Sequence, residues 1–158
     1  VDVKVRLAVP EDIDHIMDLA RLVWHENGLA KNLDETAVRN AVIWAVHCGN
    51  GVCGVIGQIG KPLEGVVLLQ VTKWWYSGEV HLEELCVFTH PDFRSAKGGR
   101  AKKLVQFSKY VSDRLGMPLT IGILSNKQTE AKIRLYRREL GEPAGAFFTY
   151  GAKTGQES

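Results

Sequence analysis

Apolar residues recur every three or four positions in four stretches of the chain, which is the spacing of one face of an α-helix. The clearest stretch runs from Ile13 to Trp24, after a proline and two carboxylates that suit the first turn of a helix. The other three stretches follow Asp34, Gly99 and Asn126. Each stretch is followed by glycine, the residue that most often ends a helix. The pattern therefore predicts about four helices.

Other segments have the pattern of β-strands. Residues 1–8 alternate between polar and apolar, and residues 65–75 contain the nearly continuous apolar run V-V-L-L-Q-V, which suits a strand covered on both faces. Four further segments have strand character, namely 52–59, 79–89, 119–124 and 146–150.

This order predicts a three-layer α/β fold, with a mixed central sheet of about six or seven strands flanked by about four helices. No repeat or linker interrupts it, so we expect one domain over residues 1–151 and a C-terminal tail over residues 152–158.

The composition is that of an ordinary globular protein. Hydrophobic residues make up 45% of the 158 positions and charged residues 24%, and no stretch approaches the roughly 20 apolar residues of a membrane span. A net charge of +2 is too small to predict nucleic-acid binding. We therefore expect a soluble protein with no membrane partner. Nucleic-acid binding is the less favoured alternative, through the basic faces at residues 94–103 and at Lys132, Arg134, Arg137 and Arg138.

The three cysteines, Cys48, Cys53 and Cys86, form no C-x-x-C motif, and no histidine has a partner at metal-ligand spacing. Free thiols indicate a reducing compartment. The first residues also lack the basic and then apolar layout of a signal peptide. The prediction is a cytoplasmic protein without a metal.

A basic loop that contains two glycines joins a predicted strand to a predicted helix between Leu82 and Leu104. Free N–H groups at a helix start, small residues and positive charge together favour the binding of phosphate. The alternative is that the glycines serve only the turn and the charges only a solvated helix face. No G-x-G-x-x-G or G-x-x-x-x-G-K motif follows a strand, so neither a dinucleotide site nor a P-loop is indicated. Five cations lie within ten residues, namely Arg94, Lys97, Arg100, Lys102 and Lys103.

This region resembles the signature of the GNAT superfamily of N-acetyltransferases, a strand L-x-V followed by a proline and then R/Q-x-x-G-x-G/A at a helix start. Leu85-Cys86-Val87 is similar to the strand, and Pro91, Arg94, Gly99 and Ala101 are similar to the rest, although Arg94 lies two residues early.

Downstream, K-I-R-L-Y-R-R-E-L-G at 132–141 resembles the family's helix ending L-Y-x-x-x-G-F. Glu142 stands where the family has an aromatic residue, and Thr129 stands where an asparagine is frequent, with Asn126 one turn earlier. The likeness is nearest to small GNAT-like proteins encoded by phages and prophages.

The resemblance implies acetyl-CoA as acyl donor. The backbone of Leu85, Cys86 and Val87 would pair with the pantetheine arm between strands that splay apart, and an N–H near Leu85 or Cys86 would polarise the thioester carbonyl. The amides of the loop would hold the pyrophosphate. The implied cofactor residues beyond the strand are Arg94, Ser95, Ala96, Lys97, Gly98, Gly99, Arg100, Ala101 and Asn126.

The resemblance also implies an acid at Tyr136, which would protonate the leaving thiolate; the alternative is a tyrosine that only packs on its helix. His81, Glu83 and Glu84 are the candidates for the base, and we favour Glu83, although each can also be a solvated strand residue. Alternation places His81 and Glu83 on one face of the strand and Glu84 on the other, unless a bulge interrupts the strand.

The predicted acceptor is a primary amine of a small molecule, a peptide or a protein lysine. An acidic and aromatic lining would suit a cationic amine, whereas the same aromatic residues can instead pack in the core. A non-catalytic module that binds acyl-CoA or a protein partner is the alternative function, and a homodimer is possible. The lining residues would be Trp24, His25, Glu26, Asp34, Trp44 and residues 74–76.

Overall fold

A computed structural model describes residues 2–124 and 129–152 of the chain. It contains the four predicted helices, of which the first is preceded by one turn of 3-10 helix and the third by another. In chain order the elements are β1 (Arg6–Leu7), a 3-10 turn (Pro10–Asp12), α1 (Ile13–Asn27), α2 (Glu35–Val46), β2 (Gly51–Ile56), β3 (Gly65–Lys73), β4 (Val80–Thr89), a 3-10 turn (Pro91–Phe93), α3 (Arg100–Leu115), β5 (Leu119–Thr120) and α4 (Thr129–Leu140).

The strands form one sheet in the order β1-β2-β3-β4-β5. The first three pairings are antiparallel and the β4–β5 pairing is parallel, so the sheet is mixed, as predicted. The predicted six or seven strands were too many, because the described residues contain five. Residues 146–150, which the sequence predicted as a strand, pair with no strand of the sheet, and Phe148 and Tyr150 are 93% and 104% exposed.

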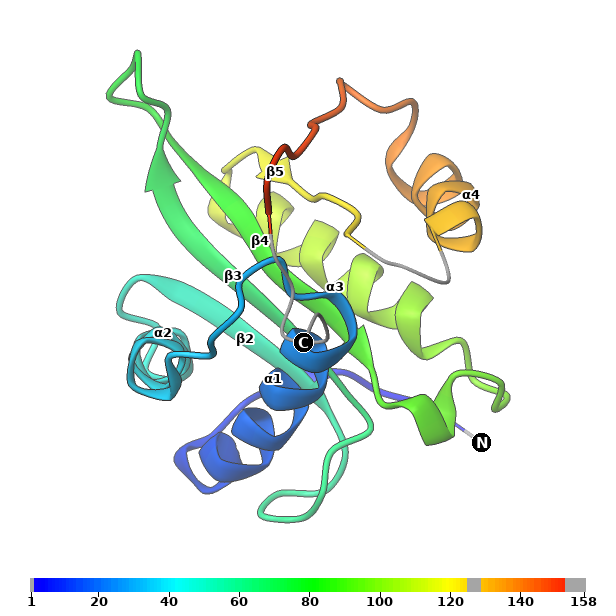
Figure 1. Cartoon of the computed structure of the whole chain (residues 1–158). Helices are drawn as coiled ribbons and strands as arrows, with labels where there is room; N and C mark the ends of the chain where they lie inside the picture. The colour runs from blue at the N-terminus through cyan, green and yellow to red at the C-terminus, as the bar shows by residue number, and fades with distance from the viewer. Residues whose placement is uncertain (1, 125–128, 153–158) are drawn as a thin grey trace.

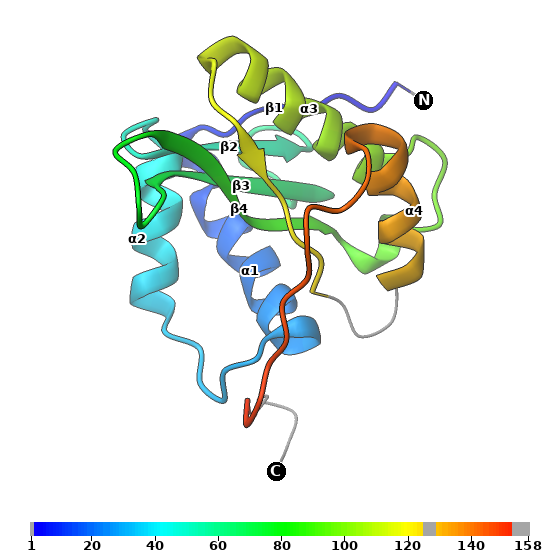
Figure 2. The same ribbon diagram turned by 90° about the horizontal axis from the view of Figure 1, so that it is seen from above.

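Helices cover both faces of the sheet. Figure 2 shows α1 and α2 on one side and α3 on the other, with α4 beside α3. Within β3, Val66 and Leu68 pack in the core under α1 and α2, whereas Val67 and Leu69 pack in the core under α3. The continuous apolar run of β3 therefore has the predicted cause, which is burial on both faces. In the described part of the chain, no helix is long and apolar enough to cross a bilayer.

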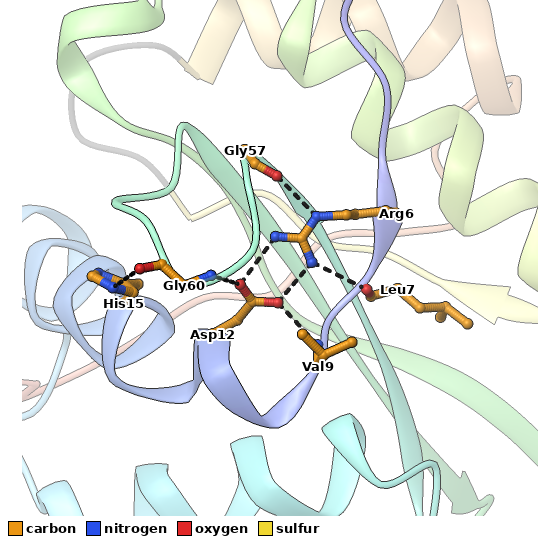
Figure 3. A network of polar contacts seen from close by, with 7 residues as sticks. All are labelled: Arg6, Leu7, Val9, Asp12, His15, Gly57 and Gly60. Carbon is orange, nitrogen blue, oxygen red and sulfur yellow. Dashed lines mark hydrogen bonds and ion pairs between the residues drawn. The ribbon is translucent and has the colours of Figure 1, made fainter.

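The short strand β1 is held by a buried ion pair (Figure 3). The Asp12 side chain is 0% exposed and accepts hydrogen bonds from Arg6 Nη1 at 2.7 Å and Nη2 at 3.0 Å. The backbone N–H groups of Val9 and Gly60 donate to the same carboxylate. Burial alone would raise the pKa of Asp12, but the hydrogen bonds and the charge of Arg6 outweigh it and lower that pKa. The pair links β1, the start of α1 and the β2–β3 loop.

Two glycines shape the turn before α3. Gly98 and Gly99 have φ angles of +121° and +58°, in the left-handed region that other residues rarely adopt. A Cβ atom on Gly98 would lie 2.4 Å from Cγ2 of Val3, so a side chain would also clash there. The sequence G-G is thus needed to turn the chain into the start of α3.

A β-bulge interrupts β4 at Leu85. In the β3–β4 ladder Leu68 pairs with Cys86 and Leu69 pairs with Glu84, which leaves Leu85 without a partner on β3. Before the bulge Leu82 faces α3, so Glu84 shares that face and Glu83 points to the side of α1 and α2. After the bulge Cys86 instead packs on the α1 and α2 side. The bulge therefore ends the simple alternation along this strand.

Candidate functional site

A cavity of about 470 Å³ lies where β4 and β5 separate. The two strands pair only at Leu82–Leu119 and Glu83–Thr120. Beyond that point residues 84–88 of β4 line one wall of the cavity and residues 121–124 line another, with the end of α1 and part of α4 completing it. On the side that faces β5, the backbone of residues 84–88 consequently has no neighbouring strand among the described residues.

A second cavity, of about 290 Å³, lies between the end of β4, the start of α3 and α4. The two cavities adjoin, because residues of α1, β4 and α4 line both of them. Together they form a path from the β4–β5 opening to the first turn of α3. The shared residues are Asn27, Val87, Phe88, Lys132 and Tyr136.

The predicted cofactor strand lies on this path. Leu85, Cys86 and Val87 all line the first cavity. The Leu85 side chain is 44% exposed, as expected for the residue that the bulge pushes outward. Burial, with a contribution from the charge of Glu84, raises the pKa of the Cys86 thiol to about 12. That thiol is therefore protonated at neutral pH and is a poor nucleophile.

Part of the predicted loop also lies on the path. Arg94, Gly99, Arg100 and Ala101 line the second cavity. The first turn of an α-helix leaves N–H groups without intrahelical acceptors, and no side chain caps α3 at Gly99. These amides are available to an anion. Ser95, Ala96, Lys97 and Gly98 do not line this cavity, and Asn126 lies outside the described residues.

Two of the loop cations are engaged by carboxylates. Arg94 donates from Nη1 and Nη2 to Glu26 at 2.6 and 2.7 Å, and from Nε to the carbonyl of Thr89 at 3.1 Å. Arg100 is 8% exposed and donates from Nε and Nη2 to Glu64 at 2.8 and 2.6 Å. Both guanidinium groups thus fasten the loop to the rest of the fold.

Glu84 is a partly buried carboxyl group on the wall of the first cavity. The N–H of Gly122 donates to its Oε1 at 3.3 Å, across the opening between β4 and the segment after β5. Burial raises the pKa of Glu84 to about 7, against the weaker opposing effects of that hydrogen bond and of the charge of Lys132. A carboxyl group with such a pKa exchanges protons near neutral pH.

Tyr136 and Lys132 lie one turn apart on α4, which places them on the same face of the helix. Both line both cavities. The Tyr136 side chain is 8% exposed, and burial raises its pKa, so the hydroxyl keeps its proton at neutral pH. Burial lowers the pKa of Lys132, although the nearby carboxylates oppose this.

The other two candidates for the base differ in position. The side chain of Glu83 is exposed and lines the first cavity. His81 is 4% exposed and lines neither cavity. Its ring instead stacks on Trp74, with the ring centres 3.6 Å apart and the planes 12° apart. The structure therefore brings Glu83, Glu84 and Tyr136 together and places His81 elsewhere.

Most of the residues expected around the acceptor have structural partners. Asp34 caps α2 by accepting from the N–H of Ala37 at 3.0 Å, and Trp24 Nε1 donates to the carbonyl of Ala30 at 2.9 Å. Trp75 is 94% exposed at the tip of the β3–β4 hairpin, which projects from the domain in Figure 1.

Trp44 lines a third cavity of about 270 Å³, between α2 and the sheet. Leu85 lines this cavity as well as the first one. The cavity beside Trp44 therefore shares a lining residue, Leu85, with the cavity at the β4–β5 opening.

Sequence reasoning missed Gly122, and it named Lys132 and Arg138 only as part of a basic run whose charges would serve nucleic acid or the phosphates of CoA equally well. Lys132 lies four residues before Tyr136, a spacing that places it beside a residue already assigned to the site. Gly122 has no such signal, because its place depends on where β5 stops pairing. In the part of the chain that the structure describes, no three histidine, cysteine, aspartate or glutamate side chains group as metal ligands would.

Known structures show the same fold. An integron cassette protein from the mobile metagenome of Cole Harbour Salt Marsh gives a TM-score of 0.69 at 18% identity, covering 94% of this chain and 90% of that one. The aminoglycoside N-acetyltransferase AAC(6')-Iy, in complex with a bisubstrate analogue of CoA and acetylneamine, gives 0.69 at 13% identity, covering 97% and 99%.

A ribosomal-protein-alanine N-acetyltransferase from Brucella melitensis biovar Abortus 2308 gives a TM-score of 0.66 at 16% identity, covering 97% and 99%. These likenesses show that the chain has the GNAT fold, which confirms the resemblance found in the sequence. No family model and no curated protein matches the chain. The nearer likeness to phage-encoded proteins stays a prediction.

Proposed function

We propose that the protein is an N-acyltransferase that moves an acetyl group from acetyl-CoA directly to a primary amine, with both substrates bound together. One observation carries this proposal. The strand edge that β5 leaves open at residues 84–88 lies in the same cavity as Glu84 and Tyr136, and that cavity continues to the start of α3. One path would thus contain a strand edge, a proton acceptor, a proton donor and a phosphate site.

The described residues fit acetyl-CoA as the donor. On the edge that faces away from β3, the backbone of residues 84–88 offers N–H and C=O groups to an extended, amide-containing arm such as pantetheine. The free amides at the start of α3 and the positive end of its dipole favour the pyrophosphate. The two cavities that hold these regions adjoin, since they share five lining residues.

The bulge would supply the group that polarises the thioester. Leu85 has no partner on β3, and β5 has stopped pairing before it. A backbone N–H at the bulge, of Leu85 or Cys86, would donate to the thioester oxygen, where negative charge develops during acyl transfer. Acetyl-CoA supplies the activated acyl group, and the protein holds that group beside the amine.

Glu84 and Tyr136 would move the protons. Glu84, with a pKa near 7, accepts one proton from the ammonium group, so that the neutral nitrogen can bond to the acyl carbon. The nitrogen loses a second proton as the amide forms, and this proton replaces the one that Tyr136 gives up. Tyr136, which is protonated at neutral pH, donates to the sulfur as the carbon–sulfur bond breaks. The proposal moves the base from Glu83 to Glu84, because Glu84 is the one that burial brings into the useful pKa range.

The acceptor is proposed to be a cationic amine that arrives over Leu85. Glu83 carries an exposed carboxylate at the first cavity, and Trp44 provides an aromatic surface at the third. A carboxylate and an aromatic face together suit an ammonium group. Two of the similar structures carry names that specify acetyl transfer to an aminoglycoside and to a ribosomal-protein alanine.

Thermal unfolding in the presence of nucleotides tests the donor site first. Acetyl-CoA and CoA at a hundred times their dissociation constants should add roughly 2.7 kcal/mol and raise the midpoint by several degrees, whereas NAD and ATP should not. A panel of primary amines with detection of released thiol then tests transfer. If acetyl-CoA binds but no amine in the panel causes release of the CoA thiol, the alternative of a non-catalytic module would be favoured.

Tyr136→Phe separates chemistry from binding. The change removes only the hydroxyl, so the affinity for acetyl-CoA should stay within about threefold while turnover falls about 10- to 100-fold. A loss of acetyl-CoA affinity with unchanged turnover would contradict the assigned role.

We also propose a cellular location and an oligomeric state for the protein. The proposed location is the cytoplasm, because the three cysteines are free thiols, which indicate a reducing compartment. We also keep a homodimer as a proposal, since the short edge strands β1 and β5 leave backbone groups that a second copy could pair with. Size-exclusion chromatography with light scattering tests the latter.

A further inference from the structure

The two arginines that the sequence assigns to the phosphates are not free to bind them. Arg94 makes a two-bond ion pair with Glu26, and Arg100 makes another with Glu64. Both arginines also lie over phenylalanine rings, Arg94 at 5.0 Å from the centre of Phe88 and Arg100 at 4.8 Å from that of Phe93. A phosphate could recruit either guanidinium only by displacing a carboxylate that already occupies its hydrogen-bond donors.

We propose that Lys102 of α3 and Arg138 of α4 are the side chains that bind the phosphates of CoA. The inference rests on the proposed function and names which cations serve that site. Both residues line the second cavity, from two different helices. Both side chains are exposed, and neither has a carboxylate partner among the described residues.

Packing between α3 and α4 brings Lys102 and Arg138 to the same cavity. Val105 of α3 forms a small core with Leu135 and Tyr136 of α4, and Ala101 packs against it. Lys102 follows Ala101 directly, and Arg138 lies one turn after Leu135 on the same face of α4. The contact that joins α3 to α4 therefore brings one cation from each helix to the rim of the same cavity, beside the free amides at the start of α3.

The charge at this rim supports the assignment. Glu26 and Glu64 offset the positive charge of Arg94 and Arg100, so those pairs add little net attraction for an anion. No carboxylate among the described residues pairs with Lys102 or Arg138, and both lie beside the start of α3, where the helix dipole is also positive. Five cations thus line the second cavity: Arg94 and Arg100 hold the loop, Lys132 is half-buried near the charge of Glu84, and Lys102 and Arg138 face the ligand.

Isothermal titration calorimetry on five forms of the whole chain tests the division: wild type, Lys102→Gln, Arg138→Gln, and two matched controls. Lys103→Gln changes the neighbouring exposed lysine, and Arg134→Gln changes an exposed arginine one turn earlier on α4; neither residue lines the second cavity. CoA, dephospho-CoA and pantetheine serve as probes. Circular dichroism and thermal unfolding without ligand establish that each variant is folded.

Lys102→Gln and Arg138→Gln should each weaken CoA binding about threefold to tenfold, and the controls should weaken it less than about twofold. The effect should shrink at high salt, because exposed charges are screened. Pantetheine, which lacks phosphates, should bind all five forms equally. A smaller effect with dephospho-CoA than with CoA would assign the residue to the 3'-phosphate, and an equal effect would assign it to the pyrophosphate.

Wild-type affinity for CoA in both site variants would overturn the inference and leave the proposed function standing. An equal loss in site and control variants would also overturn it, because the attraction would then be a general effect of positive charge. A wild-type chain that binds neither CoA nor acetyl-CoA would overturn the proposed function together with this inference.

Discussion

Two carboxyl groups removed from water behave in opposite ways in this protein. Asp12 is fully buried and accepts four hydrogen bonds, two from Arg6 and two from backbone N–H groups, so its pKa is lowered (Figure 3). Glu84 is partly buried and accepts one longer hydrogen bond, from Gly122, so burial dominates and its pKa rises to about 7.

The difference separates a structural carboxylate from one suited to chemistry. A carboxylate whose lone pairs are occupied stays ionised and resists proton transfer. A carboxyl group at a cavity wall, with few partners and a pKa near neutrality, can give and take protons. Burial by itself does not distinguish the two groups; the number of donors around each oxygen does.

The largest effect expected from this comparison is on catalysis. Glu84→Gln should reduce turnover about 10²- to 10⁴-fold, because the amide cannot accept the proton of the amine. Affinity for acetyl-CoA should change little. Wild-type turnover should rise with pH through about 7, where Glu84 ionises, and the variant should lose that rise. Steady-state rates between pH 5 and 9 provide the measurement.

Glu83→Gln is the matched control for that experiment, since Glu83 is the adjacent carboxylate and lines the same cavity. It should lower turnover far less than Glu84→Gln. The reverse order of effects would restore Glu83 as the base and would remove the role that we assign to the raised pKa.

A smaller effect, on stability, is expected at the other carboxylate. Asp12→Asn should reduce the free energy of unfolding by about 3 kcal/mol at pH 7, because Arg6 would lose its charged partner. The folded-state pKa of Asp12 lies below its ordinary 3.8, so this stabilisation is present above that pH and is lost as the pH falls through the folded value. Urea unfolding at pH 7 and pH 3 measures both.

Asp14→Asn serves as the control, because the Asp14 side chain is 84% exposed in its ion pair with Arg39. It should cost less than about 1 kcal/mol. Turnover per folded molecule should be unchanged in Asp12→Asn, since Asp12 lines neither of the two adjoining cavities. A specific loss of turnover at full folding would break the distinction between the two carboxylates.

The smallest expected effect is an increase, rather than a decrease, in the free energy of unfolding. The pKa of Glu84 is raised in the folded state from 4.5 to about 7, so folding favours the protonated form and the native state loses stability as the pH rises through that window. Glu84→Gln should therefore stabilise the chain by about 1 to 2 kcal/mol at pH 8, allowing for partial exposure, and by nothing at pH 4. Lower stability of the variant at pH 8 would contradict a raised pKa.

Local pattern was sufficient to predict most elements of the fold. The four helices, the doubly buried strand β3 and the glycine turn before α3 all depend on neighbouring residues, through helical spacing, continuous apolar runs and the left-handed angles of Gly98 and Gly99. The strand at residues 85–87 was likewise predictable from its motif, and it lines the first cavity, while its role in holding a cofactor stays a proposal.

Long-range pairing decided the rest. The segment 146–150 has the apolar and aromatic composition of a strand, yet no sheet edge pairs with it among the described residues. The bulge at Leu85 depends on the register with β3, and it determines which face Cys86 takes. His81 was a candidate by sequence, and only its stack on Trp74 shows that it lies off the path.

The sequence by itself determined the helices, the fold class and the presence of five cations near the start of α3, because these follow from residue type and spacing. Tertiary structure alone decided which cations are free, since Glu26 and Glu64 lie far away in sequence and reach Arg94 and Arg100 only in the folded chain. It also decided that Glu84, rather than Glu83, is buried. The pairing of a charge and the burial of a side chain both depend on which residues are neighbours in space. Only the folded chain determines those neighbours.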